Sequence, residues 1–225
     1  MNKSQLFIFL LILIADIVAI CFDFEIGEFF FKPLICIWLM ACFVQQTREI
    51  QSNLKRWLLG GLLFSWAGDL LLIFAGYDSL FFLLGLSAFL IAHIFYILLF
   101  HFIRLKENIS SRWWLVLPVV VYYGFIISLL GPYLGDMKLP VRIYGIIISF
   151  MLMLGSHMMY NTKKIAGYLI VCGALLFVLS DSLLAINKFY QPFELASLFI
   201  MLTYGLAQLF ITMGVIRYLS SAYKE

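Results

Sequence analysis

Eight long apolar stretches follow one another along this chain, and they restrict its fold more than any other feature of the sequence. Each is about 20 residues long, the length that an α-helix needs to cross the hydrocarbon core of a bilayer. Of the 225 residues, 64% are hydrophobic and only 12% are charged. So few charged residues could not cover the surface of a soluble protein of this size. The sequence therefore predicts an integral membrane protein.

The apolar stretches predict an all-α bundle of eight transmembrane helices that forms a single domain over residues 1–225. The connections are short and contain no low-complexity linker. No small-residue cleavage site and polar region follow the first stretch, so we expect a retained helix rather than a signal peptide. The helices are expected near residues 5–22, 29–46, 57–75, 79–101, 113–131, 140–160, 165–187 and 195–219.

The basic residues are divided unevenly between the two ends of the predicted helices. Eleven of the 15 fall on the side of the N-terminus, namely Lys3, Arg48, Lys55, Arg56, Arg104, Lys106, Arg112, Lys163, Lys164, Arg217 and Lys224. The other four are Lys32, Lys138, Arg142 and Lys188. Cytoplasmic loops carry an excess of Lys and Arg, so we expect both termini in the cytoplasm. In a bacterium the membrane would be the cell inner membrane.

One short pattern occurs twice, 112 residues apart, in residues 61–72 and 173–184. In each copy a glycine lies eight residues before an aspartate, a small residue directly precedes that aspartate, and a leucine pair follows it. The aspartates are Asp69 and Asp181. Both predicted helices run outward, so the pattern predicts a parallel repeat of four plus four helices, with the aspartates near a common axis. Chance similarity between two leucine-rich segments is the alternative.

Asp69 and Asp181 are candidate catalytic residues, because an ionisable side chain at the centre of a membrane helix costs about 2.5–3.5 kcal/mol and usually has a function. Both are predicted at similar depths in the non-cytoplasmic half of the membrane. Two carboxyl groups that meet in a low-dielectric cavity repel each other when both are ionised. We therefore expect one to act as an acid and the other as a base. This pair suits acid-catalysed hydrolysis without a covalent intermediate or a metal ion.

Two lysines at the predicted outer ends of helices are candidates for binding a lipid head group. Lys32 begins the second predicted helix, and Lys188 follows Asp181 by seven residues. Ammonium groups beside two buried acids would suit a phosphate held above the reactive bond. Snorkelling of the lysine side chains to the membrane interface is the alternative explanation for both.

Four polar residues share helix faces that should point into the bundle. His93 and Tyr96 are three residues apart, and Tyr204 and Gln208 are four apart. We expect them to line the substrate cavity, although interhelical hydrogen bonds that only hold the bundle together would also explain them. Asp16 is a third acid within a predicted span. Without a partner in the repeat, it is interpreted as structural or peripheral.

The remaining reactive residue types form no recognisable site. His101 and His157 belong to no HxxxH or HExxH pattern, so no metal ion or other cofactor is predicted. There is no G-x-S-x-G pattern for a serine nucleophile. The cysteines have no metal-binding spacing and are expected to be free thiols among the helices. They are Cys21, Cys36, Cys42 and Cys172.

Five separated motifs stand in order along the predicted second to eighth helices. They are Phe31-Lys32-Pro33-Leu34, residues 65–72 around Asp69, residues 85–96 with Phe89, His93 and Tyr96, residues 173–185 around Asp181 with Phe189 after them, and Tyr204 to Gln208. This ordered set resembles the YhhN-like lysoplasmalogenases. Any single motif would be weak, but the order of all five is much more specific.

The resemblance implies an eight-helix membrane enzyme that hydrolyses the vinyl-ether bond of lysoplasmalogens. The products are a fatty aldehyde and glycerophosphoethanolamine or glycerophosphocholine, and the implied catalytic residues are Asp69 and Asp181. Such a bond is hydrolysed by protonation of its β-carbon and addition of water to the oxocarbenium ion, a reaction that suits an acid and a base. The expected partners are a lysophospholipid and membrane lipid, not nucleic acid. The sequence does not set the oligomeric state.

Three other functions stay open at the level of sequence. A small proton-coupled transporter also combines a parallel repeat with buried acids, although the paired Gly or Pro breaks of many transporters are missing here. Ala67-Gly68-Asp69 suggests an intramembrane aspartyl protease, whose other motifs are not matched. A structural or lipid-scramblase role is the third. Aldehyde release in detergent separates an enzyme from a transporter, which has no second compartment there.

Overall fold

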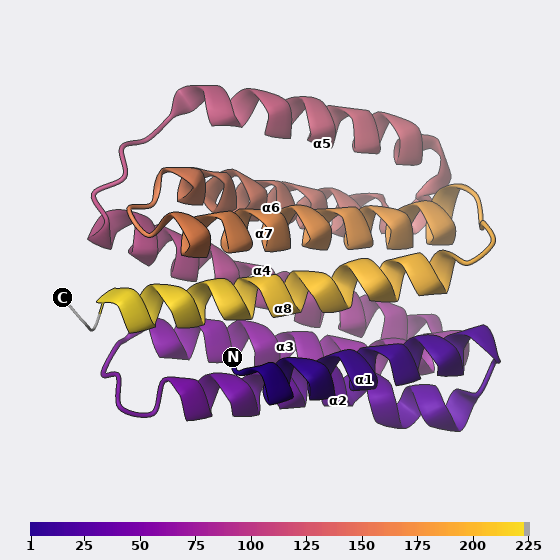
Figure 1. Ribbon diagram of the computed structural model, residues 1–225. Helices are drawn as coiled ribbons and strands as arrows, with labels where there is room; N and C mark the ends of the chain where they lie inside the picture. Colours follow the sequence, from indigo (N-terminus) through magenta and orange to yellow (C-terminus); the bar gives the residue numbers. More distant parts are fainter. Residues whose placement is uncertain (223–225) are drawn as a thin grey trace.

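The computed structural model describes residues 1–222, which form eight long helices and no strand (Figure 1). Every one of the helices, with the short 3₁₀ or π turns that extend some of them, is long and apolar enough to cross a membrane. The prediction of an all-α membrane bundle is confirmed. The helices are α1 (Lys3–Cys21), α2 (Glu25–Gln46), α3 (Leu54–Ile73), α4 (Ser79–Lys106), α5 (Val116–Leu130), α6 (Lys138–His157), α7 (Lys164–Ala185) and α8 (Ala196–Ala222).

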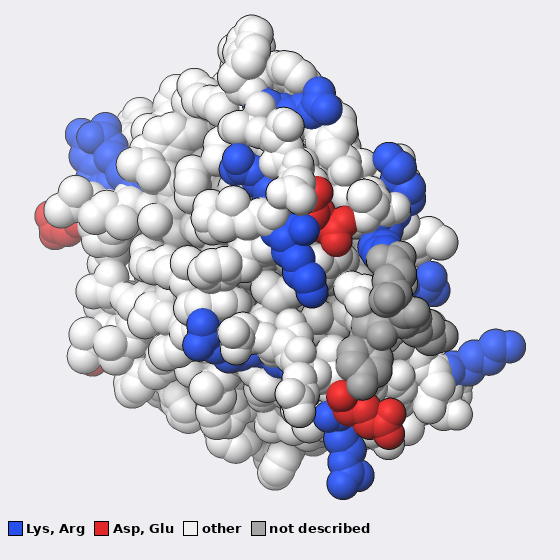
Figure 2. Space-filling view, turned by 90° about the vertical axis from the view of Figure 1, so that its left-hand side faces the viewer, with Lys and Arg blue, Asp and Glu red and all other residues white. Residues whose placement is uncertain are grey.

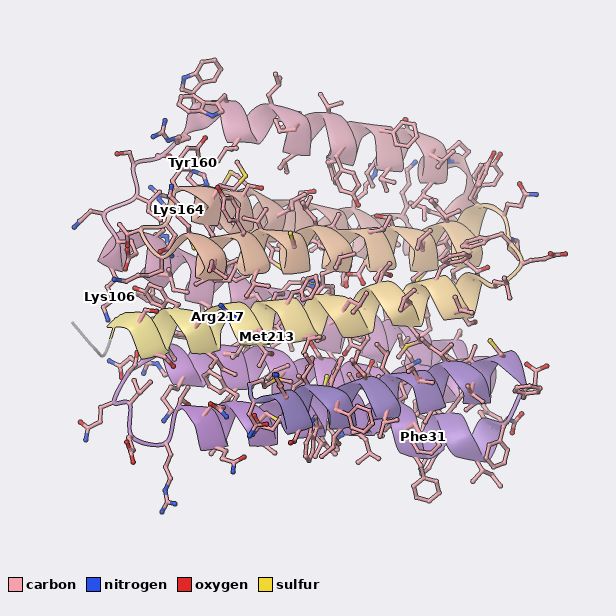
Figure 3. The ribbon with its side chains drawn as sticks, viewed as in Figure 1. Phe31, Lys106, Tyr160, Lys164, Met213 and Arg217 are labelled. Atoms are coloured by element: carbon pink, nitrogen blue, oxygen red, sulfur yellow. The ribbon has the colours of Figure 1, made fainter. Side chains whose placement is uncertain are left out.

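α1 begins and α8 ends at the same end of the bundle, on the left in Figure 1. We call this the basic end, because Lys and Arg side chains are spread over it (Figure 2). Lys106 and Lys164 lie there, whereas Phe31 lies toward the opposite end (Figure 3). We call the opposite end the acidic end, after the acids in and beside its connections, such as Glu25 and Asp78. Lys224 lies outside the described residues, and the membrane side of each end stays a prediction.

α8 is the central helix and α5 is the peripheral one. In the apolar part of α8, 61% of the residues are buried inside the protein, compared with 11% in the span that contains α5. α8 packs against α7, α1, α2 and α3, whereas α5 packs mainly on α6. Leu117, Val121 and Phe125 of α5 are exposed, which is typical of a surface that faces lipid.

The most extensive helix contacts are α3 with α4 and α7 with α8, and small residues of the duplicated pattern make both possible. A Cβ atom on Gly173 would lie 2.8 Å from the backbone nitrogen of Ile211 and 2.9 Å from the carbonyl oxygen of Ala207. A Cβ atom on Gly68 would lie 2.6 Å from the ring of Phe89. These glycines therefore have a packing role in both halves, Gly68 directly before Asp69 and Gly173 eight residues before Asp181.

α2 begins at Glu25, four residues before the predicted start near residue 29. Glu25 and Glu28 lie in its first turn, where carboxylates stabilise the positive end of the helix dipole. The earlier start brings Glu25, Glu28 and Lys32 onto one face of α2, since they are three and seven residues apart. Pro33 consequently lies inside the helix rather than at its start.

Candidate functional site

Both aspartates of the duplicated pattern lie on the wall of one cavity, which we call the aspartate cavity. It has a volume of about 140 Å³ and is bounded by residues of α1, α2, α3, α4, α7 and α8. Lys32, Phe89 and Tyr204 lie on the same wall as Asp69 and Asp181. The fold thus brings two acids and one of the two candidate lysines to a single cavity toward the acidic end.

Asp69 is almost completely buried, with 1% of its surface exposed. The hydroxyl group of Tyr204 donates a hydrogen bond of 2.7 Å to its Oδ2 atom. The thiol of Cys36 donates to the same oxygen over 3.7 Å and lies 3.3 Å from the Tyr204 hydroxyl. Lys32 is the cation that acts on this carboxyl group. Asp69 is therefore surrounded by donors from α2 and α8 that favour a negative charge.

Asp181 is more accessible, with 13% of its side chain exposed. The hydroxyl group of Tyr144 donates a 2.5 Å hydrogen bond to its Oδ2 atom. The Nε2 atom of the fully buried His93 lies 3.5 Å from the same oxygen. Asp181 also borders two smaller cavities, of about 40 and 30 Å³, that Tyr144 shares. The second aspartate thus faces open space on more than one side.

The partners of the two aspartates follow one scheme. Each aspartate has one partner on the preceding helix of its own half, Cys36 on α2 or Tyr144 on α6. The other partner comes from the last helix of the opposite half, Tyr204 on α8 or His93 on α4. A two-fold relation between the halves would produce such an exchange of partners, and the repeat itself stays a prediction.

Tyr96 and Gln208 bind each other instead of lining the aspartate cavity. The Tyr96 hydroxyl group donates a 2.5 Å hydrogen bond to Oε1 of Gln208, and both side chains are fully buried. Their positions differ by 112 residues, the spacing of the duplicated pattern. The two residues are absent from the described wall of the aspartate cavity. Their bond joins α4 to α8 on the side of the cavity toward the basic end. This geometry is the interhelical hydrogen bond that the sequence left as an alternative.

Lys188 lies away from the aspartate cavity, on an exposed turn. Its ammonium group is 5.0 Å from the centre of the Phe82 ring, a cation–π contact. Phe82 in turn packs edge-on against Phe189, and both rings line a different, smaller cavity. Among the described residues, Lys32 is therefore the lysine on the wall that Asp69 and Asp181 share.

An aromatic cluster separates the surroundings of the two aspartates. Phe177 is fully buried, and its ring centre lies 4.6 Å from that of His93 and 5.6 Å from that of Tyr204. It thus stands between the neighbour of Asp181 and the donor to Asp69. Sequence reasoning assigned no role to this residue, since a phenylalanine in an apolar helix gives no signal of its own.

Asp16 is another residue whose surroundings the sequence did not reveal. It is completely buried, and neither of its carboxylate oxygens has a hydrogen-bond partner among the described residues. Lys32 and Asp69 interact with it electrostatically, and Ile20, one turn further along α1, lines the aspartate cavity. Its position in a membrane span was the only available signal.

The cysteines are free thiols, as predicted. Cys36 and Cys42 are buried, and Cys21 and Cys172 are exposed. Within residues 1–222, no three His, Cys, Asp or Glu side chains are grouped so that they could hold a metal ion. The polar groups of the described site include carboxyl, hydroxyl, thiol, imidazole, ammonium and amide groups, the last from Asn187.

Comparisons with known proteins give consistent matches over most of the chain. The YhhN family profile matches residues 27–215. The chain is 35% identical to lysoplasmalogenase TMEM86B of Homo sapiens, over 82% of this chain and 73% of that protein. It is 30% identical to lysoplasmalogenase TMEM86A of Homo sapiens, over 82% and 75%. A lysoplasmalogenase of Mycobacterium bovis is 30% identical over 71% of this chain and 60% of its own length. No solved structure gives a significant match.

Proposed function

This chain belongs to the YhhN family, and we propose on that basis that it is a lysoplasmalogenase. The reaction is hydrolysis of the vinyl-ether bond of a 1-alkenyl-glycerophosphoethanolamine or 1-alkenyl-glycerophosphocholine. The products are a fatty aldehyde and the corresponding glycerophosphodiester. The observation that carries the proposal is the presence of two aspartates, the buried Asp69 and the partly buried Asp181, on one cavity wall inside a membrane protein. Two carboxyl groups supply the acid and the base that this reaction needs.

The proposed reaction begins with transfer of a proton from one carboxyl group to the β-carbon of the vinyl ether. The resulting oxocarbenium ion is stabilised by the other group, an ionised carboxylate, as in glycosidases. That carboxylate then removes a proton from the water molecule that adds to the α-carbon. As the hemiacetal collapses, the first carboxylate takes the proton of its hydroxyl group and the C–O bond to glycerol breaks. The second carboxyl group gives its proton to the glycerol oxygen, which leaves as a hydroxyl group. Both carboxyl groups return to their starting states.

The surroundings of the two aspartates suggest a division of these roles. Asp69 accepts hydrogen bonds from Tyr204 and Cys36 and interacts with the cation Lys32, contacts that favour an ionised carboxylate. Asp181 has Tyr144 and a buried histidine as partners, and no cation interacts with it among the described residues. We therefore assign Asp181 as the proton donor and Asp69 as the carboxylate.

The substrate would lie with its polar part toward the acidic end. Lys32, on the wall of the aspartate cavity, is positioned to bind the phosphate. His93 would hold Asp181 in position and Tyr204 would hold Asp69. The bond between Tyr96 and Gln208 would fix α4 against α8 on the side toward the basic end. The alkenyl chain would follow the apolar helix faces. Lys188 would act only on a head group that reaches the outer surface, and the site would lie in the non-cytoplasmic half of the membrane.

The test is aldehyde release from 1-alkenyl-lysophosphatidylethanolamine by the purified protein in detergent. Asp69→Asn and Asp181→Asn are each expected to reduce kcat by at least about 1,000-fold, because neither amide can transfer a proton. Thermal melting of the variants checks their folding, and Asp136→Asn, at an exposed position of the acidic end, serves as a matched control. Near-normal turnover by either cavity variant would reject the carboxyl pair.

Isotopes and a chelator test the chemistry independently. In D₂O the new C–H bond at carbon 2 of the aldehyde should carry deuterium, since that proton comes from solvent through a carboxyl group. In H₂¹⁸O the glycerol product should contain no label, because the bond broken lies on the vinyl side of the ether oxygen. Activity should survive EDTA. A proton-coupled transporter with the same acids would release no aldehyde at all.

A further inference from the structure

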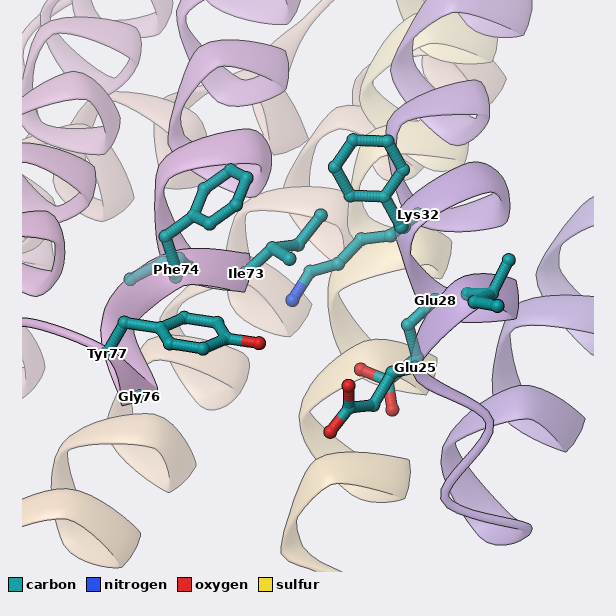
Figure 4. A pocket seen from close by; sticks show the side chains of 10 residues that line it. Glu25, Glu28, Lys32, Ile73, Phe74, Gly76 and Tyr77 are labelled. Carbon is teal, nitrogen blue, oxygen red and sulfur yellow. The ribbon is translucent and has the colours of Figure 1, made fainter.

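A second and larger cavity opens at the acidic end, between the start of α2 and the end of α3 (Figure 4). Its volume is about 600 Å³, within the usual range of ligand-binding pockets. We call it the end cavity. The residues that carry its chemistry are Glu25, Glu28, Phe29, Lys32, Phe74 and Tyr77. It is thus a mixed site with a cation, two carboxylates and three aromatic rings.

The end cavity and the aspartate cavity share part of their walls. Glu28, Lys32 and Leu72 line both of them. A bound molecule can therefore extend from Asp69 and Asp181 past Lys32 into the end cavity. In a lysoplasmalogen three glycerol carbons separate the vinyl-ether oxygen from the phosphate ester, and the head-group alcohol lies beyond the phosphate. The order of groups in the substrate matches the order of the two cavities.

The charged groups of the end cavity face one another without pairing. Figure 4 shows the Lys32 ammonium group and the carboxylates of Glu25 and Glu28 extending into the same space, with the Tyr77 hydroxyl group beside them. Glu28 and Lys32 are four residues apart on α2 and interact electrostatically. Nevertheless, no ion pair shorter than 4 Å joins Lys32 to a carboxylate within residues 1–222. These positive and negative groups remain open to a ligand that carries both charges.

Aromatic side chains form one side of the same cavity. The ring centres of Phe29 and Phe74 are 6.2 Å apart, and those of Phe74 and Tyr77 are 6.4 Å apart. Tyr77 is 79% exposed, so its ring is accessible from outside the bundle. Aromatic faces attract cationic amines, and carboxylates bind them directly. The dipole of α2 explains an acid in its first turn, but not a lysine and three rings around the same space.

We infer that the end cavity binds the cationic amine of the substrate's head group, with Glu25 and Glu28 as its counter-charges and Lys32 on the adjoining phosphate. The cavity would therefore select phosphodiesters that end in an amine, such as phosphoethanolamine, over phosphodiesters without one. This inference rests on the proposed function for the identity of the lipid. It adds specificity residues to the reaction, and it leaves the catalytic roles of Asp69 and Asp181 unchanged.

The first experiment compares two alkenyl lysolipids that differ only beyond the phosphate, one with an ethanolamine and one with a methyl ester. The wild-type protein should prefer the ethanolamine substrate about tenfold in kcat/KM, the effect of one well-formed charged contact. Glu25→Gln with Glu28→Gln should bring this ratio close to one, and the ratio is the readout because Glu28 also lines the aspartate cavity. Glu194→Gln, an exposed acid of the same end, should keep the wild-type ratio.

The second experiment measures binding of the corresponding 1-alkyl lysolipids, which contain no vinyl ether and are not cleaved. Tighter binding of the ethanolamine analogue by the wild type, lost in the double variant, supports the inference even without turnover. Equal binding of both analogues, or an unchanged preference in the double variant, overturns it. Absence of aldehyde from every alkenyl lipid would reject the proposed function alone. Thermal melting excludes misfolding of the double variant.

Discussion

Two tyrosine hydroxyl groups connect the acids of the site to helices that are far away in sequence. Tyr204 donates to Asp69 across 135 residues, and Tyr144 donates to Asp181 across 37. Both are among the most buried tyrosines of the chain, at 3% and 8% exposure. A buried hydroxyl group that donates to a carboxylate holds the carboxylate in position and stabilises its negative charge. The two hydroxyl groups should therefore act on catalysis rather than on folding alone.

Removal of either hydroxyl group tests this role. A hydrogen bond to a charged group contributes about 1.5–3 kcal/mol, so Tyr204→Phe and Tyr144→Phe should each lower kcat by about 10- to 100-fold. Tyr218→Phe is the matched control, because this buried tyrosine of α8 lies about 21 Å along the helix from Tyr204. Steady-state aldehyde release gives kcat. Unaltered kcat in both variants would assign the tyrosines to packing.

At the residue scale, the sequence identified the acids but not most of their partners. Asp69 and Asp181 were predictable because a lone acid in a membrane span is costly and because the pattern around them is repeated. Cys36 and Tyr144 could not be predicted as partners, since neither belongs to a repeated pattern. Each reaches its aspartate only through the packing of the helices. Tyr204 was predicted to face the bundle interior because polar residues on one face of a membrane helix point inward, and it lies on the wall of the aspartate cavity. Its role in binding substrate stays a prediction.

At the scale of the helices, the pairs α3–α4 and α7–α8 form the frame that holds the acids. Each pair brings its backbones together at small residues one to eight positions before an aspartate. In α7 and α8 the approach is closest, because Gly173 faces the backbone of α8 and Gly214 faces that of α7. A side chain added at either glycine would have to displace the backbone of the facing helix, which cannot move aside as a flexible side chain can.

Gly173→Ala should consequently destabilise the protein by about 1–3 kcal/mol, the usual cost of overpacking a core. Gly124→Ala is the matched control, since a Cβ atom at this helical position of α5 meets nothing within 4 Å. That variant should be neutral or slightly stabilising, because alanine favours helix more than glycine. Unfolding in SDS, followed by circular dichroism, measures both. Equal stability of the two variants would contradict the packing role of Gly173.

Helix positions followed from the sequence better than helix ends did. Apolar length predicts a membrane span, but the capping and turn geometry that ends it depends on local contacts. The placement of Lys188 illustrates this limit. In a regular α-helix, residues seven apart share a face, so Lys188 was expected beside Asp181. The chain instead forms a π turn at Ile186–Tyr190, which changes the number of residues per turn and points Lys188 toward Phe82.

At the scale of the molecule, the bundle has two ends of different charge. Lys and Arg are spread over the end where α1 begins (Figure 2). Acids such as Glu25, Glu28 and Asp78 lie at the opposite end, where α2 and α4 begin. The overall architecture was predictable, because eight apolar runs leave few alternatives in a bilayer. The peripheral position of α5 was not, since its apolar sequence suits a buried helix as well as a helix in lipid.

The charge difference predicts the orientation. The basic end should lie in the cytoplasm, because positive residues near membrane spans are retained there. In a bacterial host, a fluorescent protein fused to the C-terminus should fluoresce, and alkaline phosphatase inserted after Gln191 should be active. Phosphatase fused to the C-terminus is the inverse control and should be inactive. The opposite pattern of activities would reverse the predicted topology and move the aspartates to the cytoplasmic half.

The wall that Glu28, Lys32 and Leu72 share has a further consequence for what happens after cleavage. The two products of the proposed reaction differ in phase: the aldehyde is oily and the glycerophosphodiester is soluble in water. Each would leave in its own direction, the aldehyde into the surrounding lipid and the diester through the open end. A rise in membrane aldehyde would then slow the enzyme independently of the aqueous product, so turnover would depend on how quickly neighbouring enzymes oxidise or reduce that aldehyde.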